Sequence, residues 1–363
     1  MIQFLNYLLF SVFSFFFVLR LESDALTLAI MRLTGCSFFS HPLLIAIGVT
    51  LLLLGVRRIV SLFLSTTPAT HFLTFIPSLL VLVLLSYVTA PPSAWNYAHM
   101  LIAVTGMSFF FLKMKNQRRT IDNWKSILNL SLVGWLILLG SVALLSRTGD
   151  IPLYELRTSR LLMQNLPEKA LRVGRHSLST SQRFTALRAY ALSRTGILPE
   201  RLFEYPLPQG IHQLLLTRED VPQQFLPTDS LQALYGFIPT STQAFSSLEQ
   251  QMNGPSAERL KDYWLCTLLL YKQIDRFASE LPLYYNVSPN NRNTLPKHYR
   301  EALLLYQNHR EHPILDYQPS AAEQMNYDEF LATLKQYAHP MERSNLSRRL
   351  YGTTYWWYYY FAQ

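Results

Sequence analysis

The chain has 363 residues, of which 50% are hydrophobic and 13% aromatic, and its formal net charge is +9. Nine basic and three acidic residues precede position 146, so +6 of this charge lies in the apolar first part and +3 in the remainder. A nucleic-acid partner needs a basic stripe with aromatic residues on a soluble face, and this distribution excludes one. The two cysteines, Cys36 and Cys266, are too far apart for a disulfide framework or a metal clip.

Five apolar stretches in the first 145 residues predict a bundle of transmembrane helices, because a bilayer core needs about 20 apolar residues in a helix. The first stretch has no positively charged start and no small-residue cleavage site, so we expect a retained span and not a signal peptide. The predicted spans cover residues 1–19, 38–56, 72–90, 95–112 and 126–145.

Basic residues between these stretches predict the orientation. Arg57-Arg58 ends the second stretch, and the segment Lys113–Lys125 (KMKNQRRTIDNWK) follows the fourth. The positive-inside rule puts both in the cytoplasm. We therefore expect a cytoplasmic N-terminus and a periplasmic region after Leu145. Spans two to five contain no Asp, Glu, Lys or Arg, which argues against an ion-coupled transporter.

The region after residue 145 predicts a linker at 146–160 and an α-helical domain at 161–363. Apolar residues recur with helical spacing, as in Tyr299, Ala302, Leu303 and Tyr306, and no stretch alternates with period two. Leu260–Tyr271 is apolar nearly all round and should form a central helix. We expect an all-α protein built from antiparallel helix pairs.

A segment of this region is similar to tetratricopeptide repeats, with small residues where two helices can pack closely. It reads EKALRVGRHSLSTSQRFTALRAYALSRTG. A strict 34-residue repeat is not visible, so the sequence predicts degenerate repeats, with a non-repeating helical bundle as the alternative.

The C-terminal tail, YGTTYWWYYYFAQ, is aromatic at eight of the eleven positions from Tyr351 to Phe361. It predicts either an exposed docking strip or a return to the membrane interface, where Trp and Tyr are favoured. The alternative is that the tail packs back and seals the last helices, because an exposed aromatic run invites aggregation. The candidate interaction residues are Tyr351, Tyr355, Trp356, Trp357, Tyr358 and Tyr359.

Two acidic residues, Glu22 and Asp24, follow the first span and are the weak candidates for a catalytic role. Membrane glycosyltransferases that use lipid-linked sugars resemble this layout, with acidic residues in the first external loop. A carboxylate there can act as a base or hold a divalent metal. The alternative is two solvated loop acids, since residues two apart do not share a helix face.

No metal or cofactor motif occurs, so we expect none to be bound. His298, His309 and His312 come nearest to a cluster, but their spacing is not that of zinc ligands. We expect solvated surface histidines.

Three stretches resemble an uncharacterised family of Gram-negative bacterial membrane proteins that carries a domain of unknown function. They are ALRAYALSRTGILPERLFEYP (Ala186–Pro206), LPKHYREALLLY (Leu295–Tyr306) and RRLYGTTYWWYYYF (Arg348–Phe361). The resemblance implies a polytopic membrane protein with a tetratricopeptide-like extracytoplasmic region, in a bacterium with two membranes. Typical members are longer, and the family supplies no activity, cofactor or catalytic residue.

These observations together predict an inner-membrane protein that acts as an anchored periplasmic interaction scaffold or assembly subunit. Its expected partners are the lipid bilayer and other envelope proteins, because stacked helix pairs present surfaces for partner segments. The alternative is an enzyme, or an enzyme subunit, that acts on a lipid-linked substrate at the outer leaflet.

Overall fold

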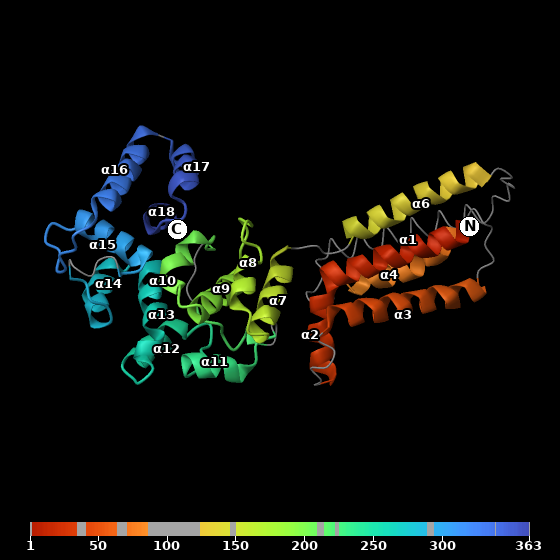
Figure 1. Ribbon diagram of the computed structural model, residues 1–363, viewed down its shortest axis with the longest axis horizontal. Coiled ribbons are helices and arrows are strands. Elements are labelled where there is room, and N and C mark those ends of the chain that lie inside the picture. Colours follow the sequence, from red (N-terminus) through yellow and green to blue (C-terminus); the bar gives the residue numbers. More distant parts are fainter. Residues whose placement is uncertain are drawn as a thin grey trace. The chain divides into compact units, whose positions relative to one another are not determined.

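The computed structural model describes residues 2–34, 41–63, 71–85, 124–145, 150–208, 214–221, 225–288, 294–337 and 339–362. All regular structure in these segments is helical, which confirms the predicted all-α class. The chain divides into two compact units, Met1–Leu153 and Tyr154–Gln363. Figure 1 shows the helices of each unit.

The first unit is a bundle of apolar helices that pack along one another. Its elements are α1 (Ile2–Phe17), the π-helical turn η1 (Val18–Glu22), α2 (Ser23–Thr34), α3 (Pro42–Phe63), the 3-10 turn η3 (His71–Phe75), α4 (Ile76–Leu85) and α6 (Trp124–Leu145). Helix α3 packs against α1, α2 and α4, and α6 packs against α1 and α4. Aromatic rings fill the centre, with the Phe75 ring centroid 4.8 Å from that of Phe10 and 5.3 Å from that of Trp135.

Two of these helical stretches, Ile2–Arg20 and Pro42–Leu62, are long and apolar enough to cross a membrane. His71–Leu85 and Ile127–Ala143 are shorter apolar helices. The predicted fourth span, residues 95–112, lies outside the described residues. The structure therefore contains two candidate spans, and the number five stays a prediction.

Helices α1, α3 and α6 each keep an apolar row that no part of the described chain covers. On α1 this row is Phe4, Leu8, Val12 and Phe16, spaced four residues apart, and Phe4 is 72% exposed. Soluble monomers rarely expose large contiguous apolar patches. The first unit therefore presents apolar surface outward as well as inward.

Helical structure in this unit extends beyond the first two predicted spans. The segment after the first span contains α2, where Ser23 and Thr27 donate their hydroxyl protons to backbone carbonyls of the preceding helical turn. These bonds let polar side chains sit in a packed helix. Helix α3 also continues through Arg57 to Phe63 and does not end at Val56, because neighbouring elements accept the Arg57 side chain.

The second unit is a bundle of short helices, several of them in neighbouring pairs. Its elements are α7 (Asp150–Met163), α8 (Pro167–Arg172), α9 (Gln182–Arg194), α10 (Leu198–Arg201), η4 (Leu202–Glu204), α11 (Thr228–Tyr235), α12 (Ala244–Met252), α13 (Ala257–Leu270), α14 (Ile274–Glu280), η6 (Leu281–Leu283), α15 (Lys297–His309), α16 (Ala321–Gln336), α17 (Pro340–Tyr351) and α18 (Tyr355–Phe361). Helix α7 begins in the last residues of the first unit and occupies most of the predicted linker at 146–160.

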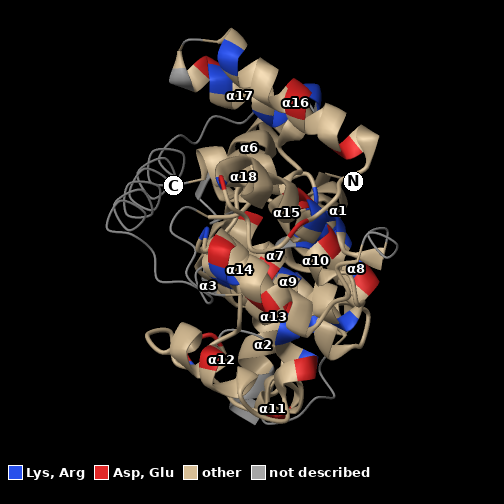
Figure 2. Cartoon of the chain, turned by 90° about the vertical axis from the view of Figure 1, so that its left-hand side faces the viewer, with Lys and Arg blue, Asp and Glu red and all other residues tan. Residues whose placement is uncertain are grey.

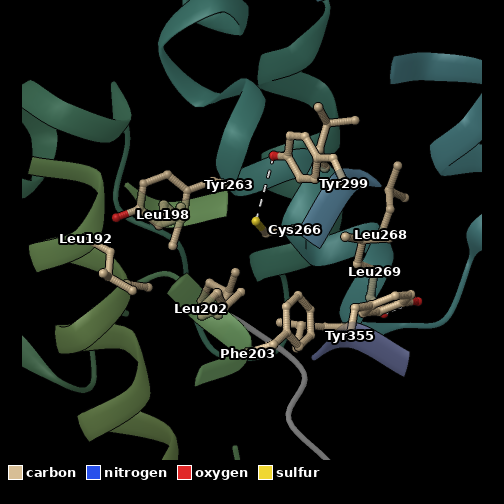
Figure 3. Close-up of a cluster of buried hydrophobic side chains, with 14 of the residues drawn as sticks. Leu192, Leu198, Leu202, Phe203, Tyr263, Cys266, Leu268, Leu269, Tyr299 and Tyr355 are labelled. Atoms are coloured by element: carbon tan, nitrogen blue, oxygen red, sulfur yellow. Dashed lines mark hydrogen bonds between the residues drawn. The ribbon is translucent and has the colours of Figure 1, made fainter. Parts of the chain in front are cut away.

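Helices α13 and α15 form the centre of this unit. Residues Tyr263 to Leu270 of α13 are all buried, as expected for a central helix, and so are Tyr299, Ala302, Leu303 and Tyr306 of α15. Figure 3 shows Cys266 in this core, pointing toward Tyr299. Its Sγ lies 3.8 Å from the Tyr299 hydroxyl, and burial raises the pKa of the Cys266 thiol. The thiol is therefore a core group and not a nucleophile.

The first prediction concerns Gly134 on α6, where a Cβ atom would lie 2.4 Å from Cε2 of the buried Phe72 ring. We expect Gly134→Ala to destabilise the first unit by about 1–3 kcal/mol through overpacking. The matched control is Gly140→Ala on the same helix, where a Cβ would meet nothing within 4 Å. Thermal unfolding of the full-length protein in detergent measures both. Equal midpoints would contradict the close approach of α6 to η3.

Candidate functional site

A cluster of buried polar side chains lies inside the apolar first unit, and we call it the Arg57 cluster. Its members come from four elements that are distant in sequence: α1, α3, η3 and α6. They are Asn6, Arg57, His71, Thr74, Ser131 and Trp135, and all of them are buried.

The side-chain oxygen of Asn6 joins α1 to α6. It accepts a hydrogen bond from the Ser131 hydroxyl at 2.8 Å and another from Nε1 of Trp135 at 2.9 Å. An indole N–H can only donate, so this contact fixes which end of the Asn6 amide is the oxygen. The amide nitrogen then faces Nδ1 of His71 at 3.5 Å.

The guanidinium of Arg57 joins α3 to η3. Its Nε donates to Oγ1 of Thr74 at 3.2 Å, and its Nη2 donates to Nε2 of His71 at 2.6 Å. The guanidinium carbon lies 4.4 Å from the ring centroid of Tyr7 and 5.0 Å from that of Phe75. Cation–π attraction of this kind stabilises a desolvated guanidinium by about 2 kcal/mol.

The Arg57–His71 contact fixes the protonation of the imidazole. An arginine cannot accept a hydrogen bond, so Nε2 of His71 is the acceptor and the ring proton of the neutral imidazole is on Nδ1. That proton then points toward the amide N–H groups of Asn6. Two donors face each other across the 3.5 Å contact, and neither satisfies the other.

Arg57 is only 4% exposed, and no carboxylate pairs with it among the residues that the structure describes. The whole first unit contains only four acidic residues, Glu22, Asp24, Asp122 and Asp150. Burial of an uncompensated charge costs several kcal/mol, and ionisable groups inside apolar bundles are usually functional. The cluster combines a positive charge with surplus donors, which is the chemistry of an anion site.

The predicted catalytic candidates do not join this cluster. Glu22 ends η1, and its side chain is outside the described residues, whereas Asp24 lies partly buried in the first turn of α2. Asn6 and Glu22 are separated by sixteen residues of nearly continuous helix, about 24 Å at 1.5 Å per residue. Within the described residues, no group of three or more His, Cys, Asp or Glu could hold a metal ion. A catalytic role for Glu22 and Asp24 stays a prediction.

Three of the six candidate interaction residues in the tail are buried in the second unit, so the expectation of an exposed strip is corrected for them. The Tyr355 hydroxyl donates to the Leu269 carbonyl at 3.1 Å, and the Tyr358 hydroxyl donates to the Leu270 carbonyl at 2.9 Å. Nε1 of Trp356 donates to the Glu301 carbonyl at 2.8 Å. These aromatic rings therefore close the core over α13 and α15.

The other three candidate residues of the tail, Tyr351, Trp357 and Tyr359, are half-buried. Their outer edges remain available to a partner. A role for them in interaction stays a prediction.

One of the three histidines expected at the surface is instead buried. His298 is 0% exposed, and its Nδ1 lies 2.8 Å from Oε2 of Glu301. The same carboxylate oxygen accepts the backbone N–H of Tyr355 at 2.7 Å, at the first residue of α18. A carboxylate is favoured at a helix N-terminus, so Glu301 holds both His298 and the start of the tail. His309 and His312 are exposed, as predicted.

A second buried guanidinium, that of Arg188 on α9, belongs to the core of the second unit. It is 1% exposed, its carbon lies 3.8 Å from the Phe184 ring centroid, and Nη2 donates to the Gly174 carbonyl at 2.8 Å. Burial lowers the pKa of Arg188 to about 10. Aromatic rings enclose the guanidinium, and its hydrogen bond goes to a backbone carbonyl in the turn after α8. Arg188 therefore fixes this turn.

Sequence reasoning missed the Arg57 cluster because its members are up to 129 positions apart along the chain. The available signals were local: Asn6 lies within one apolar stretch, and Arg57-Arg58 directly follows the next. Neither signal shows that the two positions meet in the fold. By contrast, the spacing of three between His298 and Glu301 could have been found on the predicted helix.

Comparison with known proteins gives one match, which covers the C-terminal region. Residues 237–362 match the model of a family of unknown function (DUF6057). No curated protein and no solved structure matches the chain. The match agrees with the predicted resemblance to an uncharacterised domain, and it covers α12 to α18 with the Glu301 contacts but not the Arg57 cluster.

The second prediction concerns Glu301. We expect Glu301→Ala to cost about 2–3 kcal/mol of unfolding free energy, because it leaves the buried His298 ring and the Tyr355 N–H without an acceptor. The loss should appear as faster amide hydrogen exchange in residues 355–361. Glu329→Ala on the exposed side of α16 is the control. If both variants exchange at the same rate in the tail, Glu301 does not hold it.

Proposed function

We propose that this protein is an integral inner-membrane protein of a Gram-negative bacterium that anchors a periplasmic interaction scaffold or assembly subunit. The observation that carries the proposal is the contrast between the two units. One exposes apolar helix faces, and the other is a bundle of short helices with a charged surface.

The outward apolar rows of α1, α3 and α6 support membrane insertion. Lipid tails are as apolar as these side chains, so a bilayer removes the cost of exposing Phe4 or Leu136 to water. Five spans with a cytoplasmic N-terminus follow from the apolar stretches and the basic segments between them. This topology leaves the second unit in the periplasm.

The helix pairs of the second unit support an interaction role. Neighbouring helices in sequence pack together in α8–α9, α12–α13, α14–α15 and α16–α17, an arrangement that degenerate tetratricopeptide-like repeats share. Figure 2 shows basic and acidic residues interspersed over these helices.

The α16–α17 pair presents the best surface for a protein partner. Met325, Met341, Leu346 and Leu350 are exposed there, and Arg348 and Arg349 lie on the same helix as Leu350. Flexible methionines and apolar residues beside arginines are typical of protein-binding surfaces. The half-buried Trp357 of the tail lies against Arg348 of α17 and extends this surface. An acidic, apolar segment of another envelope protein would complement it.

The third prediction tests this surface. A photo-crosslinking residue at Leu350, which is 68% exposed on α17, should give a discrete crosslinked protein in native membranes. The same residue at Leu178, which is 73% exposed on a loop of the same unit, should not. Mass spectrometry of the product identifies the partner. A product from neither site, together with a lone species on a native gel, would contradict the scaffold role.

A variant of the predicted acidic pair separates this proposal from the enzymatic alternative. Glu22→Ala combined with Asp24→Ala should leave the Leu350 crosslink and the cellular phenotype of the protein unchanged. Loss of the phenotype with the crosslink retained would favour an enzyme that acts on a lipid-linked substrate.

The fourth prediction tests the topology. Alkaline phosphatase fused after Arg147 should be active, because that enzyme folds only after export, whereas a fusion after Arg58 should be inactive. The reverse pattern would overturn the orientation. Release of the unfused protein from membranes by carbonate would overturn the integral-membrane assignment.

A further inference from the structure

The Arg57 cluster has more donors than acceptors. The hydrogen bonds of Arg57 use its Nε and Nη2, and no hydrogen bond from its Nη1 is found among the described residues. The Nδ1 proton of His71 and the amide N–H groups of Asn6 face one another without an acceptor between them. A single anion with several oxygens would satisfy donors that the protein leaves unused.

The positive charge is not needed to hold the helices together. Asn6 already ties α1 to α6 through the neutral donors of Ser131 and Trp135. A neutral side chain at position 57 could bond to Thr74 without the desolvation cost of a guanidinium. The presence of an arginine there is therefore unexplained by packing, and a ligand of opposite charge explains it.

The cluster lies near one end of the first unit. Asn6 is in the second turn of α1, His71 begins η3, and Ser131 is in the third turn of α6. Arg57 is six residues before the end of α3. At 1.5 Å per residue, Asn6, Arg57 and Ser131 are about 6–11 Å inside the ends of their helices. Because a helix of about 20 residues is as long as the hydrocarbon core is thick, this depth is the outer part of the hydrocarbon region, next to the headgroup layer and away from the centre.

We infer that the Arg57 cluster binds the phosphate group of a membrane phospholipid at this end of the first unit. This inference rests on the proposed membrane location. Guanidinium groups bind phosphate oxygens through two parallel, charge-assisted hydrogen bonds. The exposed Ile59 and Leu62, on the same helix, offer contact to an acyl chain.

The first experiment needs no variant. Full-length protein is purified in detergent, stripped of lipid and titrated with dioleoyl phosphatidylglycerol, with dioleoylglycerol, which has the same chains but no phosphate, and with inorganic phosphate. Native mass spectrometry counts bound lipid, and thermal unfolding measures the stabilisation that ligand binding must produce. We expect bound lipid and a raised midpoint with phosphatidylglycerol alone. Equal effects of dioleoylglycerol would overturn phosphate recognition, and equal effects of inorganic phosphate would overturn the lipid headgroup as its source.

Variants then assign the site. Arg57→Gln should weaken phosphatidylglycerol binding by about tenfold to a hundredfold, the range expected for loss of hydrogen bonds to a charged group. Arg57→Lys should lose part of the affinity while keeping the charge, which helps if Arg57→Gln does not fold. Arg58→Gln, the matched exposed neighbour, should change the affinity by about twofold or less. An Arg58 effect as large as that of Arg57 would show nonspecific attraction and overturn the inference.

One further variant tests whether the chain supplies its own anion. Asp122, outside the described residues, precedes α6 at the end where Ser131 lies. If Asp122→Asn reproduces the loss of stability of Arg57→Gln in lipid-free protein, the counter-charge is internal and the inference fails. Failure of phosphate binding in a protein that still resists carbonate extraction would leave the proposed membrane location standing.

Discussion

The polar groups of the Arg57 cluster determine which elements of the first unit meet. A charged group in an apolar bundle must find acceptors or aromatic faces within reach, and Arg57 finds them on η3 and α1. Helix α3 must therefore continue past the point where its apolar run stops, and η3 must approach it closely enough for the 2.6 Å contact with His71. Gly134 on α6 has no side chain where the Phe72 ring of η3 lies, so α6 can pack beside the same turn.

In the second unit, the packing of the C-terminal tail depends on one buried polar group, the carboxylate of Glu301. The carboxylate of Glu301 lies within the core, and its two hydrogen bonds connect α15 to the first residue of α18. Trp356 adds a bond to the backbone of the same residue, and Tyr355 and Tyr358 cap carbonyls at the end of α13. Part of an aromatic tail that would aggregate in water thereby belongs to the interior, since the rings of Tyr355, Trp356 and Tyr358 are buried and their polar atoms are paired.

The sequence was informative where the physics is local. The all-round apolar pattern of α13 and the spacing of Tyr299, Ala302, Leu303 and Tyr306 predicted central helices, because a buried helix leaves no polar face. The end of α3 could not be predicted, because the sequence pattern of two arginines after an apolar run is the same whether water or distant side chains surround the arginines. The tail was ambiguous for a related reason. Tyr355 and Tyr360 are the same residue type, but one is buried and the other exposed, and the contacts of Tyr355 with Glu301 and Leu269 cannot be seen in the sequence. His298 was predicted at the surface and is buried, although its spacing of three from Glu301 indicates a side-chain contact on one helix face.

The position of α18 in the core has a consequence for the order of folding during synthesis. Helices α13 and α15 precede α18 in the chain, so the carbonyls of Leu269 and Leu270 and the carboxylate of Glu301 leave the ribosome before their partners in α18. The core around them can close only after Tyr355 to Tyr358 have been made, and until then it is open to chaperones and proteases.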